Sequence, residues 1–119
     1  PGEAAAVDWA AGRLLSGSAR SLEKLAGRAG LAQRTFQRQF RERMGVSPKL
    51  FARIARLDRL IRARNLDPRA DWLSLAIEAG YYDHQHMARD FRAFCLAGPS
   101  EFYALESAAP ERRFGIREA

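Results

Sequence analysis

The sequence predicts an all-α fold of about seven helices, in which one two-helix unit occurs twice. Two observations lead to this prediction. Apolar residues recur three and four positions apart along most of the chain, which is the spacing of one buried helix face. The glycines, prolines and apolar positions of the first half also reappear about fifty residues later, as expected for a duplicated structural unit.

Length and composition limit the possible classes of protein. The chain has 119 residues, of which 47% are hydrophobic, enough for one compact helical domain or two very small ones. Its single cysteine, Cys95, excludes an internal disulfide and a metal site built from several thiolates. No apolar run reaches the length of a transmembrane helix, and the start does not resemble a signal peptide. We therefore expect a cytoplasmic, nucleoid-associated protein with no membrane contact.

The first half of the chain predicts three helices. A lead helix spans about residues 4–15, and the segment SGSAR is its exit loop. Ser21 then caps a short helix that ends at Gly30, because glycine adopts a left-handed helix end most readily. The next helix spans about residues 33–43 and is closed by Gly45. The predicted inward residues are Val7, Ala11, Leu14, Leu22, Leu25, Ala26, Ala29, Phe36 and Phe40.

A longer helix follows the first unit. Ser47 caps it, and Pro48 occupies its first turn, where the missing N–H of proline is harmless. The helix is predicted to reach about residue 64. Its predicted buried stripe is Leu50, Phe51, Ile54, Leu57 and Ile61.

The second unit repeats the first. Residues 71–102 match residues 21–51 at an offset of 50 and, after one inserted residue, at an offset of 51, so that Gly80 matches Gly30 and Phe91 matches Phe40. Asp83 is predicted to cap the second helix of this copy. We divide the chain into a first subdomain (1–46), a linker helix (47–65), a second subdomain (66–106) and a tail (107–119).

The basic residues are unevenly distributed. The formal net charge is +6, but residues 20–64 hold 13 basic and 3 acidic side chains, and the rest of the chain is net acidic. All the basic residues except Lys24 and Lys49 are arginine. Such a basic segment favours a polyanionic partner. Arginine can form bidentate hydrogen bonds with phosphate and with guanine.

The stretch LAQRTFQRQFRERMG, residues 31–45, places this charge on one helix. Phe36, Phe40 and Met44 form its apolar stripe. The opposite face carries Arg34, Gln37, Arg38 and Arg41. Two helices joined by a tight, glycine-bearing turn, with a polar and arginine-rich second helix, make a helix-turn-helix. The outward face is therefore predicted to bind nucleic acid, with an ordinary solvated helix face as the alternative.

The motifs AGRAG, FQRQFRERMGVSP and AIEAGYYDHQHMARDF resemble those of the AraC/XylS transcription regulators. The resemblance covers about residues 5–106. It implies a seven-helix domain with two helix-turn-helix subdomains that binds double-stranded DNA in a sequence-specific way, as part of a bacterial transcription regulator and without a cofactor. Such regulators usually also have an N-terminal sensor or dimerisation domain, and because the chain opens on Pro1, we expect that domain to be missing here.

The resemblance also assigns residues to DNA. The base-reading positions fall on Arg34, Gln37 and Arg38 in the first unit and on His84, Gln85, Ala88 and Arg89 in the second. Apart from the resemblance, the residues expected at the DNA backbone are Arg20, Thr35, Arg41, Lys49, Arg53 and Arg56, and for Arg20, Lys49, Arg53 and Arg56 ordinary helix-surface charge is the alternative. His86 is expected closer to the DNA backbone or to the core. The linker helix, roughly 25 Å long, would separate the two units by about one DNA turn, so that both enter adjacent major grooves. Leu96 stands where Gly45 closes the first recognition helix, so the end of the second is expected to differ.

Other functions are less well supported by the residues. His84 and His86 are two positions apart and lie on different helix faces, so a metal site is not predicted. The aromatic residues match core positions in both copies, which favours packing over stacking on single strands. The sequence contains no catalytic triad pattern, phosphate loop or carboxylate pair, so we do not expect an enzyme.

An alternative function follows from the charge of the second unit. Residues 71–107 contain only Arg89 and Arg92 against six acids. Because phosphate contacts supply much of the affinity for DNA, this unit is expected to bind DNA more weakly than the first. The alternative is a helical interaction module in which only the first unit binds nucleic acid, while the second binds a protein such as RNA polymerase.

Overall fold

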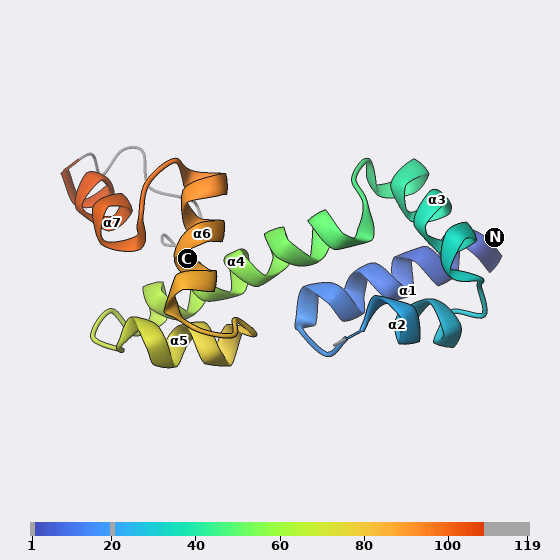
Figure 1. The fold of residues 1–119 in the computed structure, drawn as a ribbon, viewed down its shortest axis with the longest axis horizontal. Coiled ribbons are helices and arrows are strands. Elements are labelled where there is room, and N and C mark those ends of the chain that lie inside the picture. The colour runs from blue at the N-terminus through green and yellow to red at the C-terminus, as the bar shows by residue number, and fades with distance from the viewer. Residues whose placement is uncertain (1, 20, 109–119) are drawn as a thin grey trace. The chain divides into compact units, whose positions relative to one another are not determined.

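The structure is a computed structural model and describes residues 2–19 and 21–108. In these residues the chain forms seven helices and no strand (Figure 1), which confirms the predicted all-α fold. The chain divides into two compact units, Pro1–Ala55 and Arg56–Ala119. The division falls inside one long helix, so that each end of this helix belongs to a different unit.

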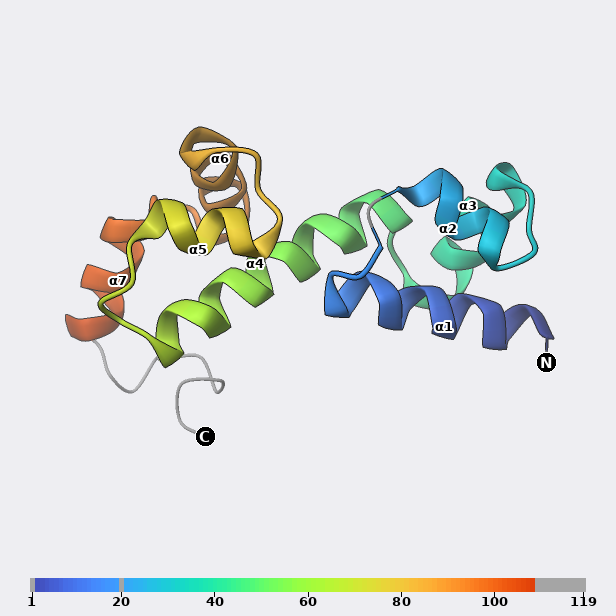
Figure 2. The same cartoon turned by 90° about the horizontal axis from the view of Figure 1, so that it is seen from below.

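The first unit contains α1 (Gly2–Ser16), α2 (Leu22–Arg28), α3 (Gln33–Met44) and the first part of α4 (Pro48–Leu66). Helix α1 lies alongside α2 and α3 (Figures 1 and 2). The rings of Phe36 and Phe40 lie 5.6 Å apart and are fully buried beneath α3. The buried cluster consists of Val7, Ala10, Ala11, Leu14, Leu25, Ala26, Phe36 and Phe40, which confirms most of the predicted inward positions.

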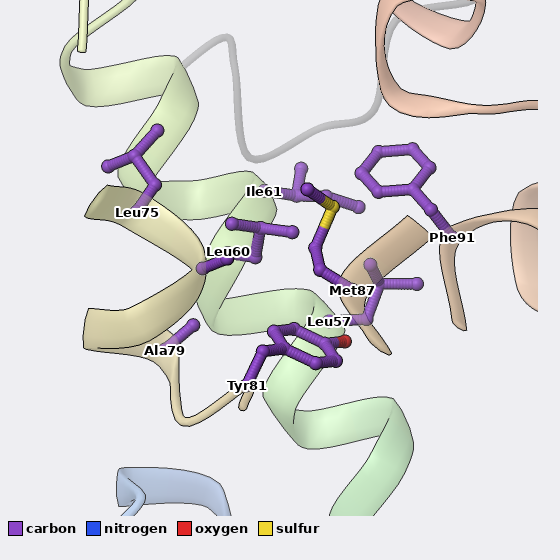
Figure 3. Close-up of a cluster of buried hydrophobic side chains, with 9 residues drawn as sticks. Leu57, Leu60, Ile61, Leu75, Ala79, Tyr81, Met87 and Phe91 are labelled. Atoms are coloured by element: carbon purple, nitrogen blue, oxygen red, sulfur yellow. The ribbon is translucent and has the colours of Figure 1, made fainter. Parts of the chain in front are cut away.

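The second unit contains the rest of α4 together with α5 (Trp72–Ala79), α6 (His84–Cys95) and α7 (Pro99–Ala108). Figure 3 shows its buried side chains, which come from α4, α5, α6 and the turn between α5 and α6. Phe91 packs edge-to-face against Trp72 and Phe102, at centroid distances of 5.9 and 5.3 Å. The cluster consists of Leu57, Leu60, Ile61, Leu75, Ala76, Ala79, Tyr81, Met87 and Phe91.

The two copies share backbone hydrogen bonds as well as apolar positions. The amide of Leu31 donates to the carbonyl of Ala26 at 3.0 Å, and the amide of Tyr81 donates to that of Ala76 at 2.9 Å. These bonds close the same turn at an offset of 50 residues. The duplication predicted from the sequence is therefore also a duplication of local structure.

Side-chain caps start the helices as predicted. Ser21 Oγ accepts the amide of Lys24 at 3.2 Å, and Ser47 Oγ accepts the amide of Leu50 at 3.1 Å. Asp83 Oδ1 accepts the amide of His86 at 2.7 Å. These bonds pair amides that have no partner within their own helix.

The end of the second recognition helix does not differ from that of the first, so this expectation was wrong. Leu96 has φ +62°, close to the left-handed conformation of Gly45 at φ +84°. The amide of Gly45 donates to the carbonyl of Arg41 at 2.9 Å, and the amide of Leu96 donates to that of Arg92 at 3.0 Å. The backbone keeps the same helix end although the residue changes, and the leucine side chain stays 89% exposed.

The predicted buried stripe of α4 was wrong at two positions. Ile54 is 45% exposed, whereas Leu60, which was not predicted to be inward, is fully buried. The stripe assumed that one face of the helix is buried along its whole length. Phe51 instead packs in the first cluster and Leu57, Leu60 and Ile61 in the second, so the buried face changes between the two ends.

Some boundaries move by a few residues. Helix α4 continues to Leu66, and α7 continues to Ala108, inside the segment expected to be the tail. The remainder of that segment, residues 109–119, lies outside the described residues.

Candidate nucleic-acid interface

The outward face of α3 carries long polar side chains with few partners. Arg34, Gln37, Arg38 and Arg41 are all exposed. Arg38 Nη1 lies 3.7 Å from Glu42 Oε1, in a pair whose two side chains are 60% and 66% exposed. Exposed pairs of this kind contribute little to stability, so Arg38 can leave Glu42 and bind a base or a phosphate at small cost.

The N-terminus of α3 is also open. Ala32 is the N-cap residue, and among the described side chains none makes a capping hydrogen bond there. The first amides of a helix attract anions because they lack intrahelical partners and lie at the positive end of the helix dipole. Thr35, in the first turn, is half-buried. The first amides of α3 thus lie next to the arginine face without a side-chain cap from the described residues.

Helix α1 holds the other end of α3 through an ion pair that the sequence did not indicate. Arg43 Nε and Nη2 donate to the two carboxylate oxygens of Asp8 at 2.6 and 2.7 Å. The hydrogen bond from Arg43 lowers the pKa of Asp8, and the same contact raises the pKa of Arg43. The pair joins the last turn of α3 to α1 through two residues that lie 35 positions apart in the sequence.

Helix α6 presents a less basic face. His84, Gln85 and Arg89 are exposed, while Ala88 is half-buried. Asp83 closes the N-terminus of α6 through its bond to the amide of His86. The second recognition helix therefore has the polar exposed positions that were predicted but lacks the open N-terminus of α3.

His86 is held inside the second unit. Its Nδ1 accepts the amide of Tyr82 at 3.1 Å, and its Nε2 lies 3.3 Å from Arg56 Nη1. The imidazole also packs edge-to-face against the ring of Tyr81 at 5.1 Å. These contacts make His86 an anchor for the turn before α6.

Arg56 belongs to the same cluster. Its guanidinium lies 5.1 Å from the centroid of the Tyr81 ring, and Arg59 donates to the carbonyl of Ala79 at 2.8 Å. Burial and the neighbouring charge of Arg56 lower the pKa of Arg59. Burial and the nearby carboxylate of Asp90 raise the pKa of Tyr81. Arg56, expected at the DNA backbone, thus also links α4 to the base of the second helix-turn-helix.

The other residues expected at the backbone are distributed over the first unit. Lys49 is exposed in the first turn of α4, and Arg53, one turn later, is half-buried. Arg20 lies outside the described residues. Lys49 and α3 belong to the same unit. This first unit contains most of the exposed arginines described above.

Three of the six acids in residues 71–107 have structural roles. Asp71 accepts the amides of Leu73 and Ser74 at 3.2 and 3.1 Å and caps α5. Asp83 caps α6, and Asp90 is 5% exposed. Two of the six acids thus cap helices while their side chains stay exposed, and only Asp90 is withdrawn from the surface.

Two copies of a helix-turn-helix, one with an arginine-rich and exposed second helix, define a DNA-binding protein of the double helix-turn-helix class. A protein-family model described as a helix-turn-helix domain matches residues 25–104, more than half of the chain. The chain belongs to this family, the AraC-type helix-turn-helix domains, which confirms the resemblance seen in the motifs.

Family membership confirms DNA binding and transcription regulation as the general function, and the DNA-binding domains of this family are not typically enzymatic. Comparisons with curated proteins and with solved structures returned no match. None of the helices in the described part of the chain is long and apolar enough to span a membrane.

Proposed function

We propose that the chain binds one asymmetric double-stranded DNA site in a sequence-specific way, by inserting α3 and α6 into adjacent major grooves. The observation that carries this proposal is the face of α3. Its arginine and glutamine side chains are exposed, while Phe36 and Phe40 on the opposite side are completely buried and fix its orientation. A rigid helix with such a face suits base recognition in the major groove.

In this proposal the first unit supplies most of the affinity. Arg34 and Arg38 bind guanine O6 and N7, and Gln37 binds adenine N6 and N7. Thr35 and Arg41 contact the DNA backbone, together with Lys49 and Arg53 on α4. The uncapped start of α3 binds a phosphate of the same strand, because its amides and dipole favour an anion.

The second unit reads the neighbouring groove with fewer charges. His84, Gln85, Ala88 and Arg89 form its base-reading set, and Arg89 is the only one with a permanent charge. Arg56 and His86, expected near the DNA backbone, act mainly by fixing the turn before α6. The second unit is therefore the weaker of the two.

The regulatory setting is also part of the proposal. We expect a further domain for effector sensing or dimerisation, because regulators of this family usually have one, and RNA polymerase is a candidate partner. A second helix-turn-helix that binds only protein is the alternative. The acidic balance that suggested it is slightly weakened because Asp90 is buried, while Asp71 and Asp83 cap helices and stay exposed.

Selection of bound sites from a random duplex library at near-physiological salt tests the proposal. We expect two preferred sequence blocks about one helical turn, roughly 10 base pairs, apart. A single block would show that only the first unit reads bases. The Arg89→Ala variant distinguishes two-groove DNA binding from a second unit that binds protein. Loss of base preference in one block supports two-groove binding, and unchanged DNA binding supports a protein-binding second unit.

A further inference from the structure

The second copy of the helix-turn-helix contains one residue more than the first, and the backbone hydrogen bonds identify it. Before the turn, Leu31 and Tyr81 correspond. After it, the amide of Phe36 donates to the carbonyl of Ala32 at 2.8 Å, and the amide of Met87 donates to that of Asp83 at 3.3 Å. The offset is therefore 50 up to Tyr81 and 51 from Asp83 onward. The extra residue is Tyr82.

Tyr82 has an anchored backbone and a free side chain. Its amide donates to His86 Nδ1 at 3.1 Å, and the next residue, Asp83, caps α6. Its side chain is nevertheless 85% exposed. A large ring is thus held on a fixed turn immediately before His84 and Gln85, the first exposed positions of the second recognition helix.

A single exposed apolar side chain is common in folded proteins, so exposure alone does not indicate a binding site. The position of Tyr82 is the second observation. The N-terminal residues of a recognition helix are those that reach base edges, and the insertion places a tyrosine beside them in the copy that has few cations. Tyrosine supplies a large contact area at low cost in conformational entropy.

We propose that Tyr82 is a DNA-contacting residue of the second unit, and that its ring packs against the apolar part of the duplex, a thymine methyl group or a deoxyribose. This inference rests on the proposed function. The contact is non-ionic and releases no counterions, so it adds affinity that does not depend on salt. It offsets the small number of phosphate-binding side chains on α6.

The test measures dissociation constants over a range of salt concentrations, with the duplex that the intact chain selects. Tyr82→Ala should weaken binding about tenfold at every salt concentration, as expected for loss of one apolar or base contact. The slope of log Kd against log salt should not change. Tyr82→Phe retains the ring and should bind like the wild type.

Leu66→Ala is the matched control, because Leu66 is 88% exposed and lies in the same unit at the end of α4, outside the helix-turn-helix. It should bind like the wild type. All three variants should keep the wild-type helix content and melting temperature by circular dichroism, since only exposed side chains change and the amide of residue 82 is retained.

Wild-type affinity of Tyr82→Ala would overturn the inference. Weak binding by Tyr82→Phe would also overturn it, since the hydroxyl group would then make the contact. Arg89→Ala separates this failure from failure of the proposed function. If Arg89→Ala has no effect, two-groove binding is wrong; if it weakens binding and Tyr82→Ala does not, only the role of Tyr82 is wrong.

Discussion

Leu96 shows at the scale of one residue how the duplication constrains the chain. The second recognition helix ends in the left-handed conformation that glycine adopts in the first unit. For a residue with a Cβ atom this conformation costs roughly 1–2 kcal/mol. The leucine side chain is exposed and buries little surface in return, so the helix end is imposed by the packing of α6 and α7 rather than favoured by Leu96.

Leu96→Gly should therefore raise the free energy of unfolding. We expect an increase of about 0.5–1 kcal/mol, because relief of the left-handed strain is partly offset by the larger entropy of an unfolded glycine. Urea denaturation followed by circular dichroism measures it. Leu66→Gly is the control: it removes an equally exposed leucine from a helical position and should lower stability. A lower stability for Leu96→Gly would contradict the strain argument.

Substitution of Arg38 tests whether the exposed face of α3 reads bases, as proposed. Arg38→Ala should weaken binding to the selected site by about 1–3 kcal/mol and relax the preference at one base position. Binding to a set of single-base variants of the site measures both effects. Arg62→Ala removes the same charge from α4, where Arg62 pairs with Asp58 at 2.8 Å, and should keep the full base preference. An equal loss for every sequence in Arg38→Ala would place Arg38 on the DNA backbone instead.

At the scale of secondary-structure elements, the contact between α1 and α3 controls the orientation of the first recognition helix. The ion pair of Asp8 and Arg43 joins two helices that also pack together through apolar side chains. A bidentate arginine–carboxylate pair adds a defined geometry to such packing. The last turn of α3 is held by this pair, and its first turn remains open.

The pair makes stability depend on pH in a predictable direction. Folding lowers the pKa of Asp8, so the folded state favours the ionised carboxylate. Its contribution is present at neutral pH, falls once the pH drops below the ordinary aspartate value near 3.8, and is lost below the folded pKa. Asp8→Asn should thus be less stable than the wild type at pH 7, with the difference shrinking in acid.

Thermal unfolding between pH 7 and pH 3 measures this difference. Arg43→Gln should cause a loss like that of Asp8→Asn, and the double variant should lose little more than either single one, because both changes remove the same interaction. Additive losses would show that the two residues act separately.

At the scale of the whole molecule, we expect the two units to contribute unequally to affinity and specificity. Exposed arginines gather on α3, whereas in α6 the basic residues are Arg89 and Arg92. Contacts to phosphate release counterions and make binding salt-dependent. The salt dependence of the intact chain should therefore come mainly from the first unit.

Lys49→Ala tests this division. The variant should bind all sequences more weakly and reduce the slope of log Kd against log salt by about one unit, because one phosphate contact is lost. Arg89→Ala should instead change the preference in only one sequence block. A change of base preference in Lys49→Ala would contradict its assignment to the DNA backbone.

The elements and the polar face of α3 could be predicted because they depend on local properties. Helical periodicity, the caps Ser21, Ser47 and Asp83, and the terminal Gly45 act within a few residues. The spacing of Phe36 and Phe40 was enough to identify the opposite, outward face. The match between the two copies allowed the same helices and turn to be predicted in the second unit, where the turn has one more residue.

Tertiary packing decided the features that depend on distant partners. Ile54 is exposed and Leu60 buried because α4 contributes different faces to two cores. Arg56 could be assigned to phosphate from its helix face alone, but its contacts with Tyr81 and His86 arise only when α4 packs against the second helix-turn-helix. Asp8 and Arg43 meet across 35 residues. The sequence by itself thus determined which segments are helical and which face of α3 is exposed, since those follow from local spacing. Only the folded chain decided which charged side chains contact other parts of the protein, as Arg43 and Arg56 do, because those contacts join residues far apart in the sequence.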